Sequence, residues 1–188
     1  MKLFIGIEFQ PEILDKLYSL QNKIREKVRT ARFPARENLH LTLQFLGQTP
    51  EEAVEAIKNS LKMVAHDSRL FALSFGDELG YFGPADQARV VWLGLKDDYL
   101  VLLELQKNIA QAMFVLGFAQ EERGYSPHIT LARDAKFNNS QVFMKNGQLD
   151  IPVEPFPAIS VINFSLIESR MVQGRIVYQA LERYRLDG

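Results

Sequence analysis

The sequence predicts a fold that mixes β-strands with amphipathic α-helices and uses one arrangement of them twice. Residues 3–9 alternate and are rich in aliphatic side chains, which is typical of a strand. Pro11 then begins a helical pattern of apolar residues that runs through Ile24. A strand, a helix and a second strand recur later in the chain, which indicates two similar halves. The 188 residues suffice for one domain, residues 1–188, or two closely joined lobes.

The rest of the first half continues this alternation of strands and helices. Residues 38–46 favour a second strand. Residues 49–52 read Thr-Pro-Glu-Glu, typical of a helix start with a capping threonine, a proline in the first turn and early acids. We therefore expect a helix from there to about Ala65. Residues 70–75 favour another strand, and the glycine-rich residues 76–84 favour turns.

The second half begins with a strong strand pattern and a long helix. Asp97 or Asp98 can cap this helix, which is expected to reach about Leu116 before Gly117 ends it. Residues 136–157 are polar and then proline-rich, so loops and at most one edge strand are expected there. The strands of this half are expected over residues 89–95, 125–133, 160–169 and 174–185, the last two as a closing hairpin.

Composition excludes several classes of protein. The chain has no cysteine, which rules out disulfides, thiolate zinc sites and a catalytic thiol. With a formal net charge of −1, a large basic face for gripping long nucleic acids is not expected. No apolar run approaches the roughly 18–20 residues that a membrane helix needs. We expect a cytoplasmic monomer that does not associate with membranes.

Two short motifs of the form His-x-Thr carry the chemistry: His40-Leu41-Thr42 and His128-Ile129-Thr130. Side chains two residues apart in a strand share a face, so each histidine lies beside its threonine. The intervening aliphatic residues face the core. Strict alternation also assigns Gln44 to the polar face, and Phe45 and Arg133 to the opposite one.

A single motif of this kind is most simply a half-exposed strand with polar residues towards water. The chain has three histidines and four threonines, and two of the three histidines have a threonine two positions later. Chance pairing at both sites is improbable at this composition. A metal site is the other alternative, but neither motif carries a carboxylate or a second histidine at ligand spacing.

The residue types suit the transfer of a phosphoryl group. Imidazole titrates near neutral pH, so one histidine can accept a proton while the other donates one. Each threonine hydroxyl can donate a hydrogen bond to a phosphate oxygen. Four side chains from two strands can thus surround one phosphorus atom without a metal ion.

The sequences around both motifs, residues 38–47 and 126–133, strongly resemble those of the two-histidine (2H) phosphoesterases. Within that superfamily the chain is similar to the bacterial and archaeal RNA 2′,3′-cyclic phosphodiesterases, historically called 2′-5′ RNA ligases. The resemblance extends to residues 3–7, 89–95, 164–169 and 174–178, and so covers nearly the whole chain.

The resemblance implies an α+β fold that is bilobal, with duplicated antiparallel sheets, flanking helices and a pseudo-two-fold axis through a central groove. It implies hydrolysis of a 2′,3′-cyclic phosphate, on an RNA end or a small nucleotide, to a 2′-phosphomonoester. In that assignment His40 donates the proton to the departing 3′ oxygen and His128 accepts one from water. Thr42 and Thr130 hold the phosphate, and no cofactor or metal is required.

Five further residues are candidates for binding the substrate. Arg133 ends the second motif and could clamp a phosphate, but strict alternation requires a bend to bring it to the face of His128. Arg32 and Arg36 precede the first motif and could line the groove, or could be surface arginines. Phe45 and Tyr125 could stack on a base, although packing or support of the motifs is the simpler role. His66, beside Asp67 at a helix end, is expected to be solvated.

Related functions remain open alongside cyclic phosphodiesterase activity. The same motifs could join RNA ends with a 2′-5′ linkage without ATP, or hydrolyse another cyclic or 2′-5′ phosphodiester. A module that binds RNA ends without catalysis is a third hypothesis. The sequence shows no glycine-rich phosphate-binding fingerprint, so no ATP site is expected.

Overall fold

The computed structural model describes residues 1–84, 87–96, 99–119, 124–139, 142–143 and 147–187. Within them, nine strands form one antiparallel sheet in the order β11-β10-β1-β3-β7-β6-β5-β8, with β2 also paired to β7. Its strands are β1 (Lys2–Glu8), β2 (Val28–Arg32), β3 (His40–Gln48), β5 (Phe75–Phe82), β6 (Ala88–Leu95), β7 (His128–Phe137), β8 (Gln148–Leu149), β10 (Asn163–Val172) and β11 (Arg175–Arg185). A two-stranded sheet joins β4 (Phe71–Leu73) to β9 (Ile159–Val161).

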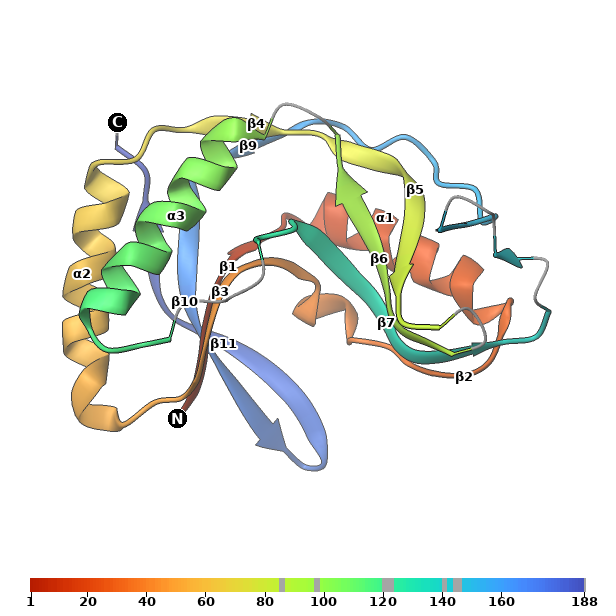
Figure 1. Ribbon diagram of the computed structural model, residues 1–188, viewed down its shortest axis with the longest axis horizontal. Coiled ribbons are helices and arrows are strands. Elements are labelled where there is room, and N and C mark those ends of the chain that lie inside the picture. Colours follow the sequence, from red (N-terminus) through yellow and green to blue (C-terminus); the bar gives the residue numbers. More distant parts are fainter. Residues whose placement is uncertain (85–86, 97–98, 120–123, 140–141, 144–146, 188) are drawn as a thin grey trace.

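In the described ranges, three α-helices cover the sheet at its two ends. They are α1 (Pro11–Arg25), α2 (Val54–His66) and α3 (Leu100–Val115). Figure 1 shows α2 and α3 together at one end of the molecule and α1 at the other. Short 3₁₀ turns, η1 (Arg36–Asn38) and η2 (Glu51–Ala53), precede β3 and α2. These elements confirm the expected α+β class.

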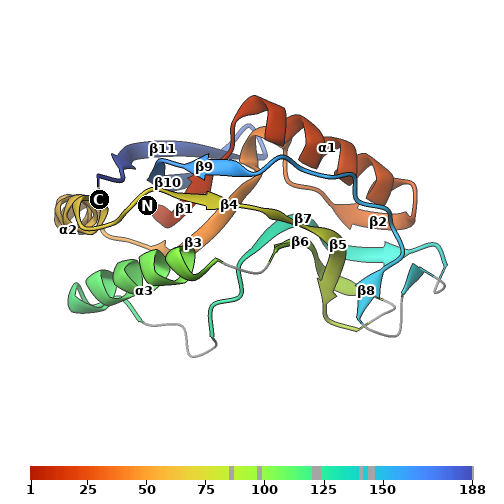
Figure 2. The same ribbon diagram turned by 90° about the horizontal axis from the view of Figure 1, so that it is seen from above.

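The helix of each half packs against strands of the other half. Helix α1 follows β1 in the chain but packs beside β2 and β7, as Figure 2 also shows. Helix α3 follows β6 but packs beside β3. Apolar residues at helical spacing explain the burial of α1, which turns Ile13, Leu17, Leu20 and Ile24 to the core. Each half therefore completes the core of the other.

The two halves meet where the two motif strands pair. Strands β3 and β7 are antiparallel and share the residue pair Leu41–Ile129, the central residue of each motif. Both side chains are fully buried. The pseudo-two-fold axis that the repeat and the family resemblance imply therefore passes between these two residues.

Each motif strand carries a β-bulge directly after its threonine. The pairing of β1 with β3 passes from Gly6–Thr42 to Ile5–Gln44 and skips Leu43. The pairing of β6 with β7 passes from Trp92–Thr130 to Val91–Ala132 and skips Leu131. Because an extra residue reverses the face of every later side chain, strict alternation is wrong beyond each bulge.

Several boundaries differ from the sequence-based expectations. Residues 76–84 were expected to form turns, but most of them belong to β5, whose glycines leave room for a large side chain from β6. Strand β2 was not anticipated, because its mostly exposed residues show no alternation. Thr49 does not cap a helix; its hydroxyl donates to the carbonyl of Gly47 at 3.3 Å, and Pro50 precedes the first turn.

Other expectations hold or fall outside the described residues. Gly117 follows α3 with φ = +90°, the left-handed conformation that ends helices. The proposed caps Asp97 and Asp98 lie outside the described residues. Among the described helices, none is long and apolar enough to cross a membrane.

Candidate functional site

The central pairing of β3 with β7 brings the two motifs together. Since Leu41 pairs with Ile129, the antiparallel register places His40 opposite Thr130 and Thr42 opposite His128. Directly opposed residues in such pairs have Cβ atoms about 4.5–5.5 Å apart. All four side chains lie on the face away from the buried Leu41 and Ile129, and each is partly exposed.

Both imidazoles are oriented in the same way. The Nδ1–H of His40 donates to the carbonyl oxygen of Asn38 at 2.7 Å, and that of His128 donates to the carbonyl of Ser126 at 2.8 Å. A carbonyl can only accept, so the proton of the neutral ring sits on Nδ1. The Nε2 atom of each ring is left with its lone pair for acid–base chemistry.

The threonine of the first motif is tied to its histidine and to the other half of the molecule. The hydroxyl of Thr42 donates to Nε2 of His40 at 2.9 Å. The hydroxyl of Tyr125 donates to the carbonyl oxygen of Thr42 at 2.8 Å. Burial raises the pKa of Tyr125, so it remains a donor at every working pH. Tyr125 thus supports the motif strand.

Asn38 holds the strand β11 against the first motif. Its side-chain Nδ2 donates to the carbonyl of Ile176 at 2.8 Å, and its Oδ1 accepts from the backbone N–H of Tyr178 at 3.2 Å. The ring of Tyr178 meets the imidazole of His40 edge-on, with centroids 5.3 Å apart. The same asparagine therefore orients His40 and places the ring beside it.

Aromatic rings enclose both histidines. The ring of Phe4 lies 4.7 Å from the imidazole of His40. Phe82 and Trp92 lie 5.4 Å and 6.2 Å from that of His128. Gly6 is the cross-strand partner of Thr42, and a Cβ there would lie 2.9 Å from the carbonyl oxygen of Leu41 and 3.3 Å from Cδ2 of His40. Only glycine leaves the imidazole its place.

Burial has the largest effect on the pKa values of His40 and His128. It lowers the pKa of His40 to about 4, and it also lowers the pKa of His128. The positive charge of Arg133 lowers the pKa of both histidines further. In the substrate-free protein both rings are therefore neutral at pH 7.

Arg133 reaches the site because of the bulge at Leu131. It lies beyond the bulge with an exposed side chain, and its charge acts on His40, His128 and Tyr178. The bend that the clamp required is thus present. Ala132, which precedes it, is fully buried.

The bulge at Leu43 has the corresponding effect in the first motif strand. Gln44 is buried, contrary to strict alternation. Phe45 is 58% exposed, and its ring lies 6.1 Å from that of Phe4 on the histidine face. A stacking surface is therefore available at Phe45.

The two halves of the site also differ at the position that pairs with each histidine across the outer neighbouring strand, β1 or β6. The residue opposite His40 is Glu8, and the residue opposite His128 is Gly94. Glu8 accepts hydrogen bonds from the Ser165 hydroxyl at 2.7 Å and from Nε of Arg183 at 3.0 Å. Its charge favours protonated His40. The pseudo-symmetry is thus broken beside the histidines.

The other candidates lie in surface ion pairs. Arg32 pairs with Asp134, with Nε 2.8 Å from the carboxylate, and is exposed. Arg36 pairs with Asp15 at 2.6 Å and also donates to the carbonyl of Pro11. Both guanidinium groups are therefore engaged in ion pairs, and a role for them in binding remains a prediction.

The remaining histidine is remote from the motifs. His66 ends α2, with an exposed side chain and its Nδ1 3.1 Å from Asp67. Its pKa is raised by that carboxylate. It therefore matches the expectation of a solvated residue at a helix end.

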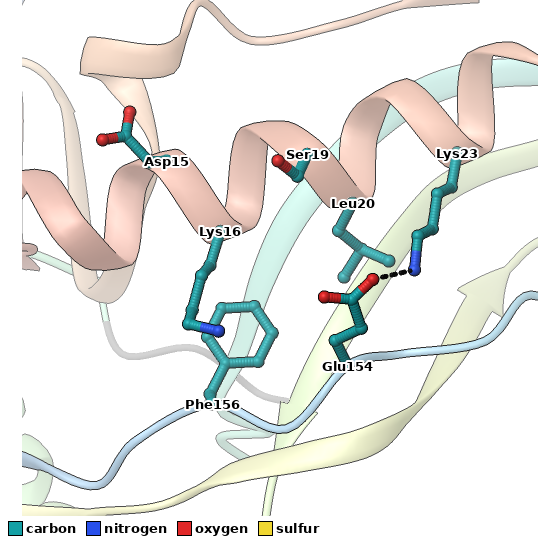
Figure 3. Close-up of a pocket in the computed structure, with 7 residues that line it drawn as sticks. All are labelled: Asp15, Lys16, Ser19, Leu20, Lys23, Glu154 and Phe156. Carbon is teal, nitrogen blue, oxygen red and sulfur yellow. Dashed lines mark hydrogen bonds and ion pairs between the residues drawn. The ribbon is translucent and has the colours of Figure 1, made fainter.

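A small hollow of about 160 Å³ lies between α1 and residues 152–156 (Figure 3). Lys23 forms an ion pair with Glu154 at 2.9 Å, and the ammonium of Lys16 lies 5.9 Å from the ring centre of Phe156. These contacts fasten the extended segment to the helix. In the described part of the chain, no group of three or more His, Asp or Glu side chains is arranged to hold a metal ion.

Several residues of the site were not singled out from the sequence, among them Glu8, Asn38, Trp92 and Tyr178. Their contacts with the motifs depend on strand pairing between segments far apart in the chain. The asparagine two residues before His40 was the one local signal, as it has the position of Ser126 before His128.

Comparison with known proteins places this architecture in a family. The family model described as "LigT like Phosphoesterase" matches residues 7–92 and 98–178. A curated RNA 2′,3′-cyclic phosphodiesterase of Escherichia coli K12 is 30% identical over 94% of this chain and 98% of its own length. One of Methanocaldococcus jannaschii is 27% identical over 98% and 100%.

Solved structures show the same fold. The protein TT0787 of Thermus thermophilus superposes with a TM-score of 0.83 at 25% identity, covering 100% of this chain and 99% of its own. Escherichia coli LigT in complex with 3′-AMP gives a TM-score of 0.82 at 28% identity, covering 100% and 98%. From the matched motifs, the duplicated sheet and these likenesses together, we conclude that the chain belongs to the LigT-like phosphoesterase family.

Proposed function

We propose that this protein is an RNA 2′,3′-cyclic phosphodiesterase that hydrolyses the cyclic phosphate to a 2′-phosphomonoester. The curated relatives that match nearly the whole chain carry that activity in their names. The complexes of Escherichia coli LigT with 3′-AMP and with phosphate support a site for a nucleotide phosphate. We further propose that the enzyme is a cytoplasmic monomer that needs neither metal nor cofactor.

The pairing of Leu41 with Ile129 is the observation that carries the proposal. It sets His40, Thr42, His128 and Thr130 around one point on a shared face. A phosphate placed there receives hydrogen bonds from two hydroxyls and meets an Nε2 atom on either side. That arrangement suits an in-line displacement, in which the attacking and leaving oxygens lie on opposite sides of phosphorus.

In the proposed reaction, a water oxygen forms a bond to phosphorus as the bond from phosphorus to O3′ breaks. His128 takes the proton from water through its free Nε2. His40 gives a proton to O3′, and the phosphate remains on O2′. Arg133 stabilises the negative charge that develops on the non-bridging oxygens.

The acid role requires His40 to take up a proton together with the substrate. Burial, and to a smaller extent the charge of Arg133, lowers the pKa of His40 to about 4. A phosphate anion beside the ring favours the imidazolium, as Glu8 does from the other side. His128 has glycine instead of a carboxylate as its cross-strand partner, which suits a base that stays neutral.

The reaction is tested by identifying the product isomer. The protein is incubated in EDTA with adenosine 2′,3′-cyclic phosphate, and the products are resolved by ³¹P NMR. We expect adenosine 2′-phosphate alone, at a rate that added Mg²⁺ or Mn²⁺ does not change. Formation of the 3′ isomer, or hydrolysis that needs a metal, would contradict the proposal.

The roles of the two histidines are tested with a substrate in which sulfur replaces the bridging 3′ oxygen. A thiolate leaves without being protonated, so this substrate bypasses the general acid. The rate defect of His40→Ala should shrink by about tenfold or more with the sulfur substrate, on the scale of general acid catalysis. The defect of His128→Ala should persist. The opposite pattern would exchange the roles.

A further inference from the structure

A glutamine of helix α1 lies buried among apolar side chains, and the proposed reaction does not use it. Gln21 is fully buried on the face of α1 that also carries Leu17, Leu20 and Ile24. In the described part of the chain, its side-chain Oε1 has no hydrogen-bond partner. Burying a polar oxygen in this way costs free energy, and a leucine would avoid that cost. The other end of the amide, Nε2, is therefore what this position provides.

The amide nitrogen of Gln21 connects the segments that carry the two motifs. It donates to the carbonyl oxygen of Leu131 at 2.9 Å and to that of Pro34 at 3.0 Å. Leu131 is the extra residue of the bulge in the second motif strand. Pro34 lies in the segment that leads to Asn38 and His40. Because carbonyl oxygens only accept, both protons of the amide are used, and an apolar side chain cannot replace them.

The bulge in β7 receives this hydrogen bond from outside the sheet. The extra residue of a bulge is left out of the regular ladder, so its buried backbone groups need other partners. Helix α1 lies beside β2 and β7 (Figure 2), and from there Gln21 reaches the carbonyl of Leu131. Arg133 follows two residues later, and the bulge brings it to the histidine face. Gln21 can thus affect the site through the course of β7.

Helix α3 repeats this arrangement in the other half. Residues 20–24 read Leu-Gln-Asn-Lys-Ile and residues 105–109 read Leu-Gln-Lys-Asn-Ile, with both leucines and both isoleucines buried. Nε2 of Gln106 donates to the carbonyl oxygen of Leu43 at 3.4 Å, and Leu43 is the extra residue of the bulge in the first motif strand. Each helix thus places a glutamine on the bulge of the motif strand that it packs against. This recurrence indicates a role in the shared site.

We propose that Gln21 is a positioning residue, which holds the bulge of β7 so that Arg133 lies beside the phosphate and the two histidines. The inference rests on the proposed function, in which Arg133 stabilises the charge on the phosphate. Gln106 is the matching residue for the bulge of β3 and for Phe45, which follows that bulge. The contribution of Gln21 to the reaction therefore passes through Arg133, whereas that of Gln106 does not.

A double-mutant cycle tests whether Gln21 acts through Arg133. Methionine is similar in size to glutamine but cannot donate, so Gln21→Met removes both hydrogen bonds. In Gln21→Met we expect kcat/KM for adenosine 2′,3′-cyclic phosphate to fall about tenfold, as for a lost hydrogen bond to a charged group. The same change made in Arg133→Gln should cost no more than about twofold. Gln106→Met should cause the same loss in the wild type and in Arg133→Gln.

The pKa values of the motif histidines give a second readout, which does not depend on turnover. They are measured by NMR titration of the substrate-free protein. Burial lowers the pKa of His40 and of His128, and the charge of Arg133 lowers both further, so Gln21→Met should raise both, as Arg133→Gln does. Glu8 and His128 also act on His40, and these variants leave both in place. The double variant should raise the two pKa values no further than Arg133→Gln alone.

Equal losses of kcat/KM on Gln21→Met in the wild type and in Arg133→Gln would overturn the proposal, because Gln21 would then only stabilise the fold. Histidine pKa values that Gln21→Met leaves unchanged would overturn it as well. If Gln21→Met does not fold, Gln21→Asn completes the same cycle, since the shorter amide cannot reach both carbonyls. A wild-type protein without turnover would contradict the proposed function, and the titration would still test the role of Gln21.

Discussion

The two histidines of the site share a local geometry but differ in their neighbours. Each donates Nδ1–H to the carbonyl two residues earlier, at 2.7 Å and 2.8 Å, which leaves the lone pair of Nε2 for acid–base chemistry. Only His40 has a carboxylate, Glu8, as its cross-strand partner. One half of a duplicated fold can thus favour a cation where the other favours a neutral base.

The lowered pKa values of both histidines predict the pH dependence of the free enzyme. The reactive form has one ring protonated and one neutral, and both lose their protons below the ordinary value of 6.5. The value of kcat/KM should therefore fall about tenfold per pH unit above pH 6.5. The fall in kcat should come at higher pH, because the bound anion raises both pKa values.

Arg133 supplies the control for this prediction. Its charge lowers the pKa of both histidines, so Arg133→Gln should move the falling limb of kcat/KM to higher pH. Arg133→Lys keeps the charge and should leave the limb in place. A value of kcat/KM that stays constant to pH 9, or a limb that Arg133→Gln moves to lower pH, would be inconsistent with this electrostatic account.

The motif residues could be found from the sequence because their signal is local. His40 and Thr42 share a face by strand alternation alone. Glu8 and Tyr178 could not be found in this way. Glu8 meets His40 because β1 pairs with β3, and Tyr178 meets it because Asn38 is hydrogen-bonded to β11.

At the scale of elements, the bulges decide which later residues reach the site. One additional residue after each threonine buries Gln44 and Ala132 and returns Phe45 and Arg133 to the histidine face. A bulge is difficult to detect in a hydrophobic pattern. Leu43-Gln44 fits the ordinary apolar–polar alternation of a strand, and Leu131-Ala132 fits a buried stretch. The regular part of each strand was therefore predictable, but its bend was not.

The glycine-rich strand β5 shows a similar limit. Its glycines favour turns when they are considered locally, but here they make space for the indole of Trp92 from the neighbouring strand. That reason lies in the packing of two elements and cannot be derived from one of them. The helices α1 and α3, in contrast, follow from their apolar spacing.

The attachment of β11 through Asn38 can be tested at this scale. Asn38→Ala leaves the carbonyl of Ile176 and the N–H of Tyr178 without these partners. We expect the free energy of unfolding in urea to fall by about 1–3 kcal/mol. We also expect kcat to fall, because the ring of Tyr178 is no longer fixed against His40.

A matched control separates positioning from general damage. The exposed Asn138 also donates from its side chain to a backbone carbonyl, that of Glu26 at 3.5 Å, so Asn138→Ala should change neither quantity. Asn38→Asp keeps the acceptor for Tyr178 and should restore part of kcat. Loss of stability in Asn38→Ala with unchanged kcat would reduce this residue to a structural role.

At the scale of the whole molecule, the exchange of helices explains why the site lies at the centre. Each half packs its helix on the motif strand of the other, so the pair Leu41–Ile129 is held from both sides. The repeated order of strand, helix and motif strand predicted the duplication. The exchange itself could not be predicted, since it depends on which sheet face each helix covers.

The three histidines of the chain permit the most direct test of the central claim, that two of them form one acid–base pair. Turnover of adenosine 2′,3′-cyclic phosphate in EDTA is measured for His40→Ala, His128→Ala and His66→Ala. The first two should each lower kcat by about 10²–10⁴-fold, the usual contribution of a general acid or base. His66→Ala, at an exposed position paired with Asp67, should match the wild type. Near-normal turnover by either motif variant would contradict the account.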